Sequence, residues 1–335
     1  MDPRLPLRDA IAHARRVEAL GYDGLHVAET VHDSLAVALL ALEHTQRIVV
    51  RTAVTLAFPR SPTLTAYGAW DLAKFSGGRF QLGLGTQIRQ NIEGRYAMPW
   101  GEPVEKMREY MGALDGLFGS FRSGGPLRYE GQHYQITRMQ PYFNPGPDDL
   151  TAPPPVYLGG VNARICQLAG ELAAGFITHP TNSNPRYLET VCLPNLRTGA
   201  ARAGRDVAEI ELVIGTQVIT GVDEAVLGAE RERQRRLFAF LYSTPAYRRT
   251  LELYGWQEMA DVLGEMVRAD EWASLHRVVT DEVIDTLIPT AGFEDLPSLL
   301  FERFGQLGQG LLVSPPLDPS SDARFAEVIA DLRAR

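Results

Sequence analysis

The chain lacks the features that mark several large classes of protein. Its 335 residues include only two cysteines, Cys166 and Cys192, which give neither a disulfide framework nor the spacing of a zinc site. No apolar run reaches the length of a membrane span, and the N-terminus carries no signal-peptide pattern. We therefore expect a cytoplasmic protein with no membrane partner.

Lysine is also scarce, and acidic residues outnumber basic ones although arginine is abundant. Lysine occurs only at Lys74 and Lys106, and the formal net charge is −8. A nucleic-acid-binding surface needs a concentrated positive field, which this balance does not favour. We expect a small-molecule substrate and no nucleic-acid partner.

Familiar catalytic motifs are absent too. The sequence contains no Gly-x-Ser-x-Gly elbow, no Walker sequence and no His-Glu-x-x-His pair, so covalent serine catalysis has no support. His26 and His32 lie six residues apart with no His-x-His pair, and a metal site in a barrel needs several ligands from different strands. We expect no metal. What remains is a redox cofactor whose ring does the chemistry while the protein orients it.

Strand-like and helical segments alternate along almost the whole chain. This alternation implies right-handed crossovers and a parallel sheet, as in a TIM (β/α)8-type barrel. A closed barrel needs eight strands, and no strand precedes the first expected helix, residues 6–20. Either the first β-strand is missing from this chain, or the sheet is not closed. The seven expected strands are residues 23–29, 47–56, 79–85, 155–158, 176–179, 210–220 and 311–313.

Two insertions interrupt this repeat, at about residues 88–154 and 222–310. The first contains a helix from Val104 to Phe121 and a hairpin from Leu127 to Tyr134, and the second is mainly helical. No linker is rich enough in glycine, serine or charge to separate two domains. We expect a single domain over residues 1–335, with the insertions forming substrate-binding walls.

Bare glycines end two of the expected strands. Gly83 and Gly85 close the strand that begins at Arg79, but Ile88 stands where a dinucleotide fingerprint needs a third glycine. Gly159–Gly160 ends another strand and opens a helix, whose free N–H groups suit a phosphate, although a tight turn without ligand is an equal alternative. The carboxyl ends of parallel strands face the ligand, so two such ends favour an elongated ligand that carries phosphate.

Polar residues follow other strand ends. Glu29 and Thr30, with His32, lie at one rim, where a carboxylate and an imidazole could relay a proton. The alternative is a solvated loop in which Asp33 or Ser34 caps the next helix. His179 ends a later strand as a ligand contact or a hydrogen-bonded rim histidine.

Several segments together resemble the luciferase-like monooxygenase superfamily. They are Gly21–Glu29, Thr52–Thr55, Arg60–Pro62, Ser76–Thr86 and Pro155–Gly160, and the Ser-Gly-Gly-Arg-Phe block with its Gly-x-Gly end is the most diagnostic part. Within the superfamily, the chain is most similar to the branch that uses the deazaflavin coenzyme F420. The resemblance implies a homodimeric oxidoreductase that transfers a hydride between F420 and a small organic substrate.

The resemblance also implies roles for particular residues. A bulge in the third strand of the family, often with a non-proline cis peptide, backs the cofactor ring and maps to about Ala53–Thr55. Relatives often carry histidine where this chain has Thr30. The predicted catalytic residues are Glu29, Thr30 and His32, and the predicted cofactor-binding residues are Ala53, Val54, Thr55, Gly85, Thr86, Gln87, Gly159, Gly160, Val161 and His179.

Two other functions compete with this prediction. One is a monooxygenase that uses flavin mononucleotide (FMN) with oxygen, and the other is a non-catalytic family member that has kept the scaffold. The sequence does not name the substrate, because the two insertions follow no recognisable pattern.

Overall fold

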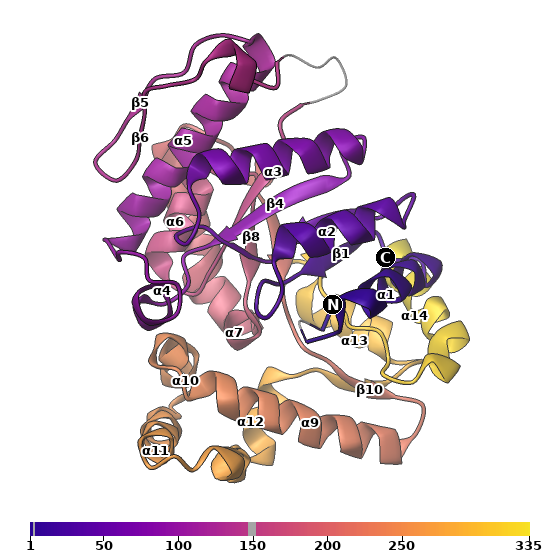
Figure 1. The fold of residues 1–335 in the computed structure, drawn as a ribbon. Helices are drawn as coiled ribbons and strands as arrows, with labels where there is room; N and C mark the ends of the chain where they lie inside the picture. The colour runs from indigo at the N-terminus through magenta and orange to yellow at the C-terminus, as the bar shows by residue number, and fades with distance from the viewer. Residues whose placement is uncertain (3, 147–151) are drawn as a thin grey trace. The chain divides into compact units, whose positions relative to one another are not determined.

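A computed structural model describes residues 1–2, 4–146 and 152–335 (Figure 1). Residues 147–151 of the first insertion therefore lie outside the described residues. The chain divides into two compact units. The first comprises Met1–Gly160, Gln167–Phe176 and Gly199–Ile210, and the second comprises Val161–Cys166, Ile177–Thr198 and Glu211–Arg335. The expectation of one domain stays a prediction.

Parallel strands form the centre of the first unit. The strand order is β1-β2-β4-β7, and β3 also pairs with β4. Leu84 of β4 pairs with Thr55 of β3 on one side and with Leu158 of β7 on the other. The carboxyl ends of these three strands therefore meet at one edge, as the sequence predicts for a ligand site. The strands are β1 (Gly24–Val27), β2 (Val49–Thr52), β3 (Thr55–Leu56), β4 (Phe80–Gly85) and β7 (Val156–Gly160).

The expected strand at residues 47–56 is interrupted. It divides into β2 and β3, and the peptide bond between Ala53 and Val54 is cis, at the position that the family resemblance implies. The Ala53 N–H donates to the Val27 carbonyl, whereas the Val54 carbonyl accepts from the Glu29 N–H. The register against β4 shifts by one residue between Arg51, which pairs with Gln81, and Thr55, which pairs with Leu84, so the prediction of one continuous strand is wrong.

Helices α1, α2, α3 and α5 of the first unit form where the sequence predicts them, whereas α4 is not predicted. Asp33 caps α2, and Ser61 caps α3 with Pro62 in its first turn. Figure 1 shows α3 and α5 side by side, and Trp70 of α3 stacks on Phe118 and meets Phe121 edge-on, both in α5. The helices are α1 (Leu7–Ala19), α2 (Ser34–Glu43), α3 (Pro62–Phe75), α4 (Arg89–Gly94) and α5 (Pro103–Ser123).

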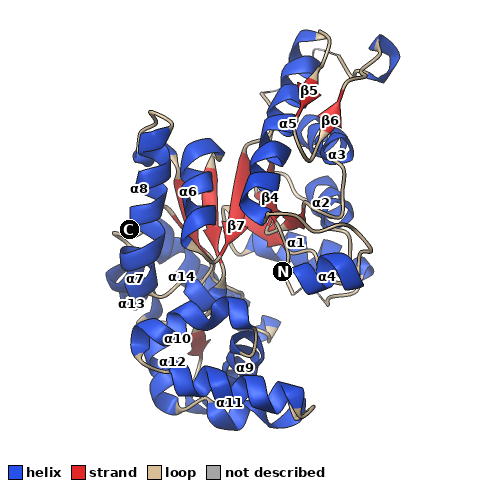
Figure 2. Ribbon diagram, turned by 90° about the vertical axis from the view of Figure 1, so that its left-hand side faces the viewer, coloured by secondary structure: helices blue, strands red, loops and turns tan. Residues whose placement is uncertain are grey.

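The predicted hairpin is formed by β5 (Tyr129–Glu130) and β6 (Gln135–Ile136), which lie next to α5 in Figure 2. Glu109 of α5 accepts hydrogen bonds from three backbone N–H groups of the hairpin turn, at Gln132, His133 and Tyr134. Among the described residues β1 is the first strand, and it follows α1. This agrees with the expectation that no strand precedes the first helix.

The second unit contains two parallel pairs, β9 (Glu211–Ile214) with β12 (Gly310–Leu311) and β10 (Ile219–Gly221) with β11 (Thr290–Gly292). A single strand over residues 210–220 is therefore wrong. The Gly215 N–H donates to the side chain of Thr178 instead of continuing a backbone ladder, and β10 begins a separate sheet. The strand β11 lies inside the insertion that the sequence predicts as mainly helical.

Helices dominate the rest of the second unit. Phe238, Leu251 and Leu263 belong to a buried apolar cluster, so the second insertion has a core of its own. The expected helix at residues 185–203 is divided by a π-helical turn, Leu188–Cys192, between α7 (Pro185–Tyr187) and α8 (Leu193–Arg202). The other helices are α9 (Glu224–Tyr242), α10 (Arg248–Tyr254), α11 (Gln257–Arg268), α12 (Asp281–Leu287), α13 (Leu296–Phe304) and α14 (Asp322–Ala334).

Helix α6 (Ala163–Leu172), strand β8 (Gly175–Thr178) and helix α8 each contribute residues to both units. None of the helices in the described ranges is long and apolar enough to cross a lipid bilayer.

Candidate functional site

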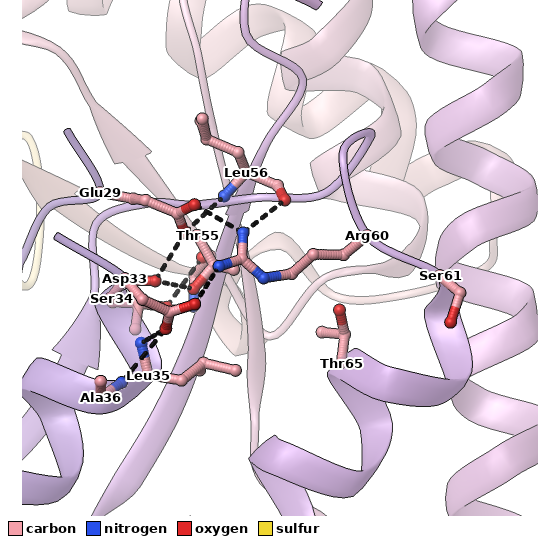
Figure 3. A network of polar contacts seen from close by, with 12 residues as sticks. Glu29, Asp33, Ser34, Leu35, Ala36, Thr55, Leu56, Arg60, Ser61 and Thr65 are labelled. Carbon is pink, nitrogen blue, oxygen red and sulfur yellow. Dashed lines mark hydrogen bonds and ion pairs between the residues drawn. The ribbon is translucent and has the colours of Figure 1, made fainter. Parts of the chain in front are cut away.

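Glu29 is the centre of a polar network at the strand ends of the first unit (Figure 3). Its side chain is only 7% exposed. One carboxylate oxygen accepts from the Ser34 hydroxyl at 2.8 Å and from the Leu56 N–H at 3.3 Å. Because the Ser34 hydroxyl has one proton and uses it here, Thr55 donates to Ser34 across their 2.8 Å contact. This chain of hydrogen bonds fastens β3 to the residues that follow β1.

Arg60 completes the network from the loop after β3. Its guanidinium contacts Glu29 and Asp33, each at 2.5 Å (Figure 3). Asp33 also accepts hydrogen bonds from the Leu35 and Ala36 N–H groups at the start of α2. Burial alone would raise the pKa of Asp33, but the Ala36 N–H and Arg60 outweigh it and lower this pKa below its ordinary value. Asp33 is therefore held as a carboxylate.

Val54 and Gly85 pack directly against each other at the same edge. A β-carbon on Gly85 would approach Cγ2 of Val54 to 2.4 Å, a distance that real side chains do not adopt. The bare backbone of Gly85 thus makes room for the Val54 side chain. This is a packing role that the sequence does not reveal. Ala53 and Val54 remain half-exposed, whereas Thr55 is buried.

Thr86 and Gln87 continue from Gly85 as a half-exposed turn. Gln87 has a left-handed backbone with φ of 60°, which is uncommon outside glycine. Its side-chain oxygen accepts from the Ile88 N–H and from the Asn91 amide, so the turn is fixed against the start of α4.

Gly159 and Gly160 are half-exposed at the end of β7, beside β4. Val161 belongs to the second unit, where its carbonyl accepts a 2.5 Å hydrogen bond from the Tyr187 hydroxyl. The bond orients the loop that opens α6. A phosphate site at these three residues stays a prediction.

Thr30 and His32 differ from Glu29 in their surroundings. Thr30 is exposed, and the His32 ring contacts the carbonyl of Leu5 at 3.2 Å. No hydrogen bond joins His32 to Glu29, both of which lie in the described part of the chain. The structure therefore does not assemble the carboxylate–imidazole relay that the sequence suggests.

His179 lies at the end of β8 in the second unit. Its ring stacks on Tyr247, with centroids 4.7 Å apart and planes 13° apart. Its Nδ1 contacts the Thr181 hydroxyl at 2.9 Å, and Asn182 accepts from the His179 N–H. Burial lowers the pKa of His179 to about 4, so the imidazole is neutral at pH 7.

Sequence reasoning missed Arg60, Ser34 and Tyr247 as parts of these arrangements. Arg60 follows a strand end, which is a usable signal, but its pairing with Glu29 depends on a contact 31 residues away in sequence. Tyr247 lies in the second insertion, which carries no pattern that aligns it with His179.

Relatives of known sequence match most of the chain. An uncharacterised protein of Mycobacterium tuberculosis is 39% identical over 90% of this chain and 89% of its own length. The 5,10-methylenetetrahydromethanopterin reductase of Archaeoglobus fulgidus is 28% identical over 84% of this chain and 80% of its own length.

Solved structures share the fold. The coenzyme F420-dependent tetrahydromethanopterin reductase of Methanopyrus kandleri has a TM-score of 0.80 at 20% identity, covering 99% of this chain and 96% of its own. The oxygenating constituent of 3,6-diketocamphane monooxygenase of Pseudomonas putida, solved with FMN, has a TM-score of 0.66 at 17% identity, covering 100% and 94%. The fold is thus a TIM-barrel-type α/β fold.

The family model for luciferase-like monooxygenases matches residues 2–295. This match covers most of the chain and includes the strand ends that carry Glu29, Val54, Gly85 and Gly159. The chain belongs to the luciferase-like monooxygenase family.

Proposed function

We propose that this oxidoreductase uses coenzyme F420 to transfer a hydride to or from a small organic substrate. The observation that carries the proposal is the close packing of Val54 on Gly85 where β3, β4 and β7 end together. An apolar side chain seated on bare backbone fits the face of a planar ring better than a charged or metal-bound group. The related methylenetetrahydromethanopterin reductase, and the F420-dependent reductase that shares the fold, support this choice of cofactor.

The proposed cofactor site uses residues from both glycine-bearing strand ends. Ala53, Val54 and Thr55 would support the ring, and Gly85, Thr86 and Gln87 would flank it. Gly159, Gly160 and Val161 would bind the phosphate through backbone N–H groups. When bound, F420 supplies the hydride chemistry, and the protein supplies orientation and exclusion of water. His179 is retained as a proposed cofactor contact in its neutral form.

Glu29 orients the site in this proposal. Its two oxygens already accept from Arg60, Ser34 and Leu56, so it holds the end of β3 in place beside the ring. Thr30 is the exposed hydroxyl next to it and is the residue that we propose to contact the substrate. His32 is a proposed proton carrier only if its ring leaves the Leu5 carbonyl.

Titration of the purified protein with F420 and with FMN tests the proposal. We expect saturable quenching of F420 fluorescence with a dissociation constant in the micromolar range or below, and weaker binding of FMN. The Gly85→Ala variant should lose most F420 affinity because its β-carbon displaces Val54. Gly119→Ala is the matched control, since Gly119 lies in α5 with open space around its β-carbon position.

Two outcomes would replace the proposal. Tight binding of FMN with none of F420 would favour a flavin monooxygenase, a function also found on this fold. Binding of neither cofactor would favour a non-catalytic family member.

A further inference from the structure

Lys106 is an unusual lysine in this protein. It is one of only two in the chain, and it is 7% exposed in the second turn of α5. Its ammonium donates to the Pro99 carbonyl at 2.9 Å and lies 4.6 Å from the centre of the Phe58 ring. No carboxylate lies within ion-pair distance of Lys106 in the described ranges. The proposed redox chemistry does not use this group.

A buried cation without an anionic partner is costly, because the protein interior does not replace the water that it loses. One carbonyl and one aromatic face satisfy only part of an ammonium that has three N–H donors. Burial lowers the pKa of Lys106 from its ordinary value, which agrees with a cation that lacks a counter-charge. A buried charge whose pKa is perturbed is a candidate for a functional site.

The surroundings of Lys106 connect it to the candidate site within the first unit. Phe58 is buried three residues after Thr55, in the loop that leads to Arg60, and its ring packs edge-on against Trp100. One turn further along α5, the Tyr110 hydroxyl contacts Thr65 at 2.6 Å and the Ser61 carbonyl at 3.4 Å. The start of α5 is therefore packed on the same loop that Arg60 fastens to Glu29.

An imidazole and an indole border the same place. A β-carbon on Gly101 would lie 3.2 Å from the His133 ring and 3.4 Å from the Lys106 side chain. Trp100 precedes this glycine. Lys106 thus lies in an aromatic setting formed by Phe58 and by Trp100 and His133 of the first insertion, the segment that the sequence predicts as a substrate-binding wall.

We propose that Lys106 binds an anionic oxygen group of the substrate, a carboxylate or a phosphate. This assignment names a substrate class for the proposed oxidoreductase and rests on that function. The aromatic rings at Phe58 and Trp100 form the apolar side of this subsite, and the ammonium supplies its charge. The substrate is therefore an anionic small molecule.

Selective 13C labelling of lysine tests the proposal on the cofactor-free protein, because the chain gives only two lysine Cε signals. Lys106→Met assigns the signals, and Lys74 is an internal control. Added acetate or inorganic phosphate should shift the Lys106 signal saturably at millimolar concentration and raise its pKa by about 1 unit, since an anion favours the charged form. Sodium chloride at equal ionic strength should not.

A Lys106 signal that ignores both anions, or that moves only as Lys74 does, overturns the proposal. Lys106→Arg keeps the positive charge, so phosphate should protect this variant against thermal unfolding more than it protects Lys106→Met.

A cofactor titration separates the two sources of an anionic group. F420 carries its own phosphate, so a Lys106→Met variant that binds F420 at least ten-fold more weakly than wild type would assign Lys106 to the cofactor and overturn the substrate assignment. We expect a change below two-fold. If wild type does not bind F420 at all, the proposed function is wrong. The anion response of Lys106 in the labelled protein is measured without F420, so it tests the anion site independently.

Discussion

Two strand ends of this protein are stabilised in opposite ways. At the end of β3 in the first unit, Arg60 is held by the carboxylates of Glu29 and Asp33. At the end of β8 in the second unit, a neutral His179 stacks on Tyr247 and contacts a hydroxyl. Both regions carry predicted site residues, but one depends on full charges and the other on a side chain without charge.

The difference determines how each region should respond to perturbation. A charged network fails when one partner is removed, because the remaining charges stay buried without compensation. A half-buried histidine that is held neutral loses stability when pH falls, because the unfolded chain binds a proton that the folded chain does not. Mutation of a charged partner and a change of pH should therefore affect the two regions differently.

The largest effect is expected for Arg60→Met. The change leaves Glu29 with an uncompensated charge at 7% exposure, and breaking such a pair costs about 3–5 kcal/mol of unfolding free energy. Urea unfolding at pH 7.5 measures it. Arg89→Met removes an exposed ion pair with Glu93, which water and salt screen, and should leave the unfolding free energy almost unchanged. Equal losses of unfolding free energy in the two variants would show that the Arg60 network stabilises the protein no more than an exposed ion pair does.

A pH series on the second region should give the next largest effect. His179 has a folded pKa of about 4 against an ordinary value of 6.5, so its stabilising contribution is complete above pH 6.5 and falls as pH drops towards 4. The total loss is about 3 kcal/mol over this window. His13 and His26 also have lowered pKa values and add to the slope.

The His179 part is isolated by comparing wild type with His179→Asn at pH 7.5, 5.5 and 4.5. The stability difference between the two proteins should shrink as pH falls. A constant difference would mean that His179 titrates normally. Asp33, whose pKa is lowered, gives its full stabilising contribution above its ordinary value of 3.8 and loses it only below that value, so its contribution stays nearly constant within this window.

Gly85→Ala should cost about 2 kcal/mol, because overpacking at a site with no free space forces Val54 to move. Gly119→Ala should instead stabilise the protein by up to about 1 kcal/mol, since it reduces the freedom of the unfolded chain at an open helical position. Thermal unfolding of the two variants measures this, since the unfolding temperature should fall in Gly85→Ala and rise in Gly119→Ala. A neutral Gly85→Ala would show that the Val54 contact is loose.

The smallest effect is expected for Tyr247→Leu, which removes the ring stacked on His179 and should cost about 1 kcal/mol. Tyr247→Phe keeps the stack and should be close to neutral. The pKa of His179, followed by NMR of its ring proton, should rise in Tyr247→Leu as water gains access, and should stay low in Tyr247→Phe. If the pKa of His179 is unchanged in both variants, the Tyr247 ring is not the cause of the low pKa.

Much of the fold follows from local pattern. The helix at residues 62–75 and the glycine-ended strand 80–85 appear where periodicity and Ser61–Pro62 capping predict them. The break at Ala53–Val54 was accessible only through family resemblance, because Thr52–Leu56 reads as one strand. The strand β11 was missed because its pairing partner lies about seventy residues earlier in the chain.

The candidate site is less predictable than the fold. A strand end identifies Glu29 as a rim residue, but not that Arg60 and Ser34 occupy its oxygens. The distance between His32 and Glu29 in sequence suggests a relay, yet the His32 ring turns to Leu5. These hydrogen-bond partners are set by contacts between residues that lie far apart in sequence. No short sequence motif indicates such contacts.

Arg60 binds two carboxylates that lie four residues apart, Glu29 and Asp33. The short segment between them, Thr30 to His32, is therefore pinned at both ends by one guanidinium. We expect substitutions in this segment to leave the start of α2 and the end of β3 in place, because Arg60 holds the residues on both sides of it. Selectivity for new substrates can be sought there at little cost in stability, provided that Arg60 is kept.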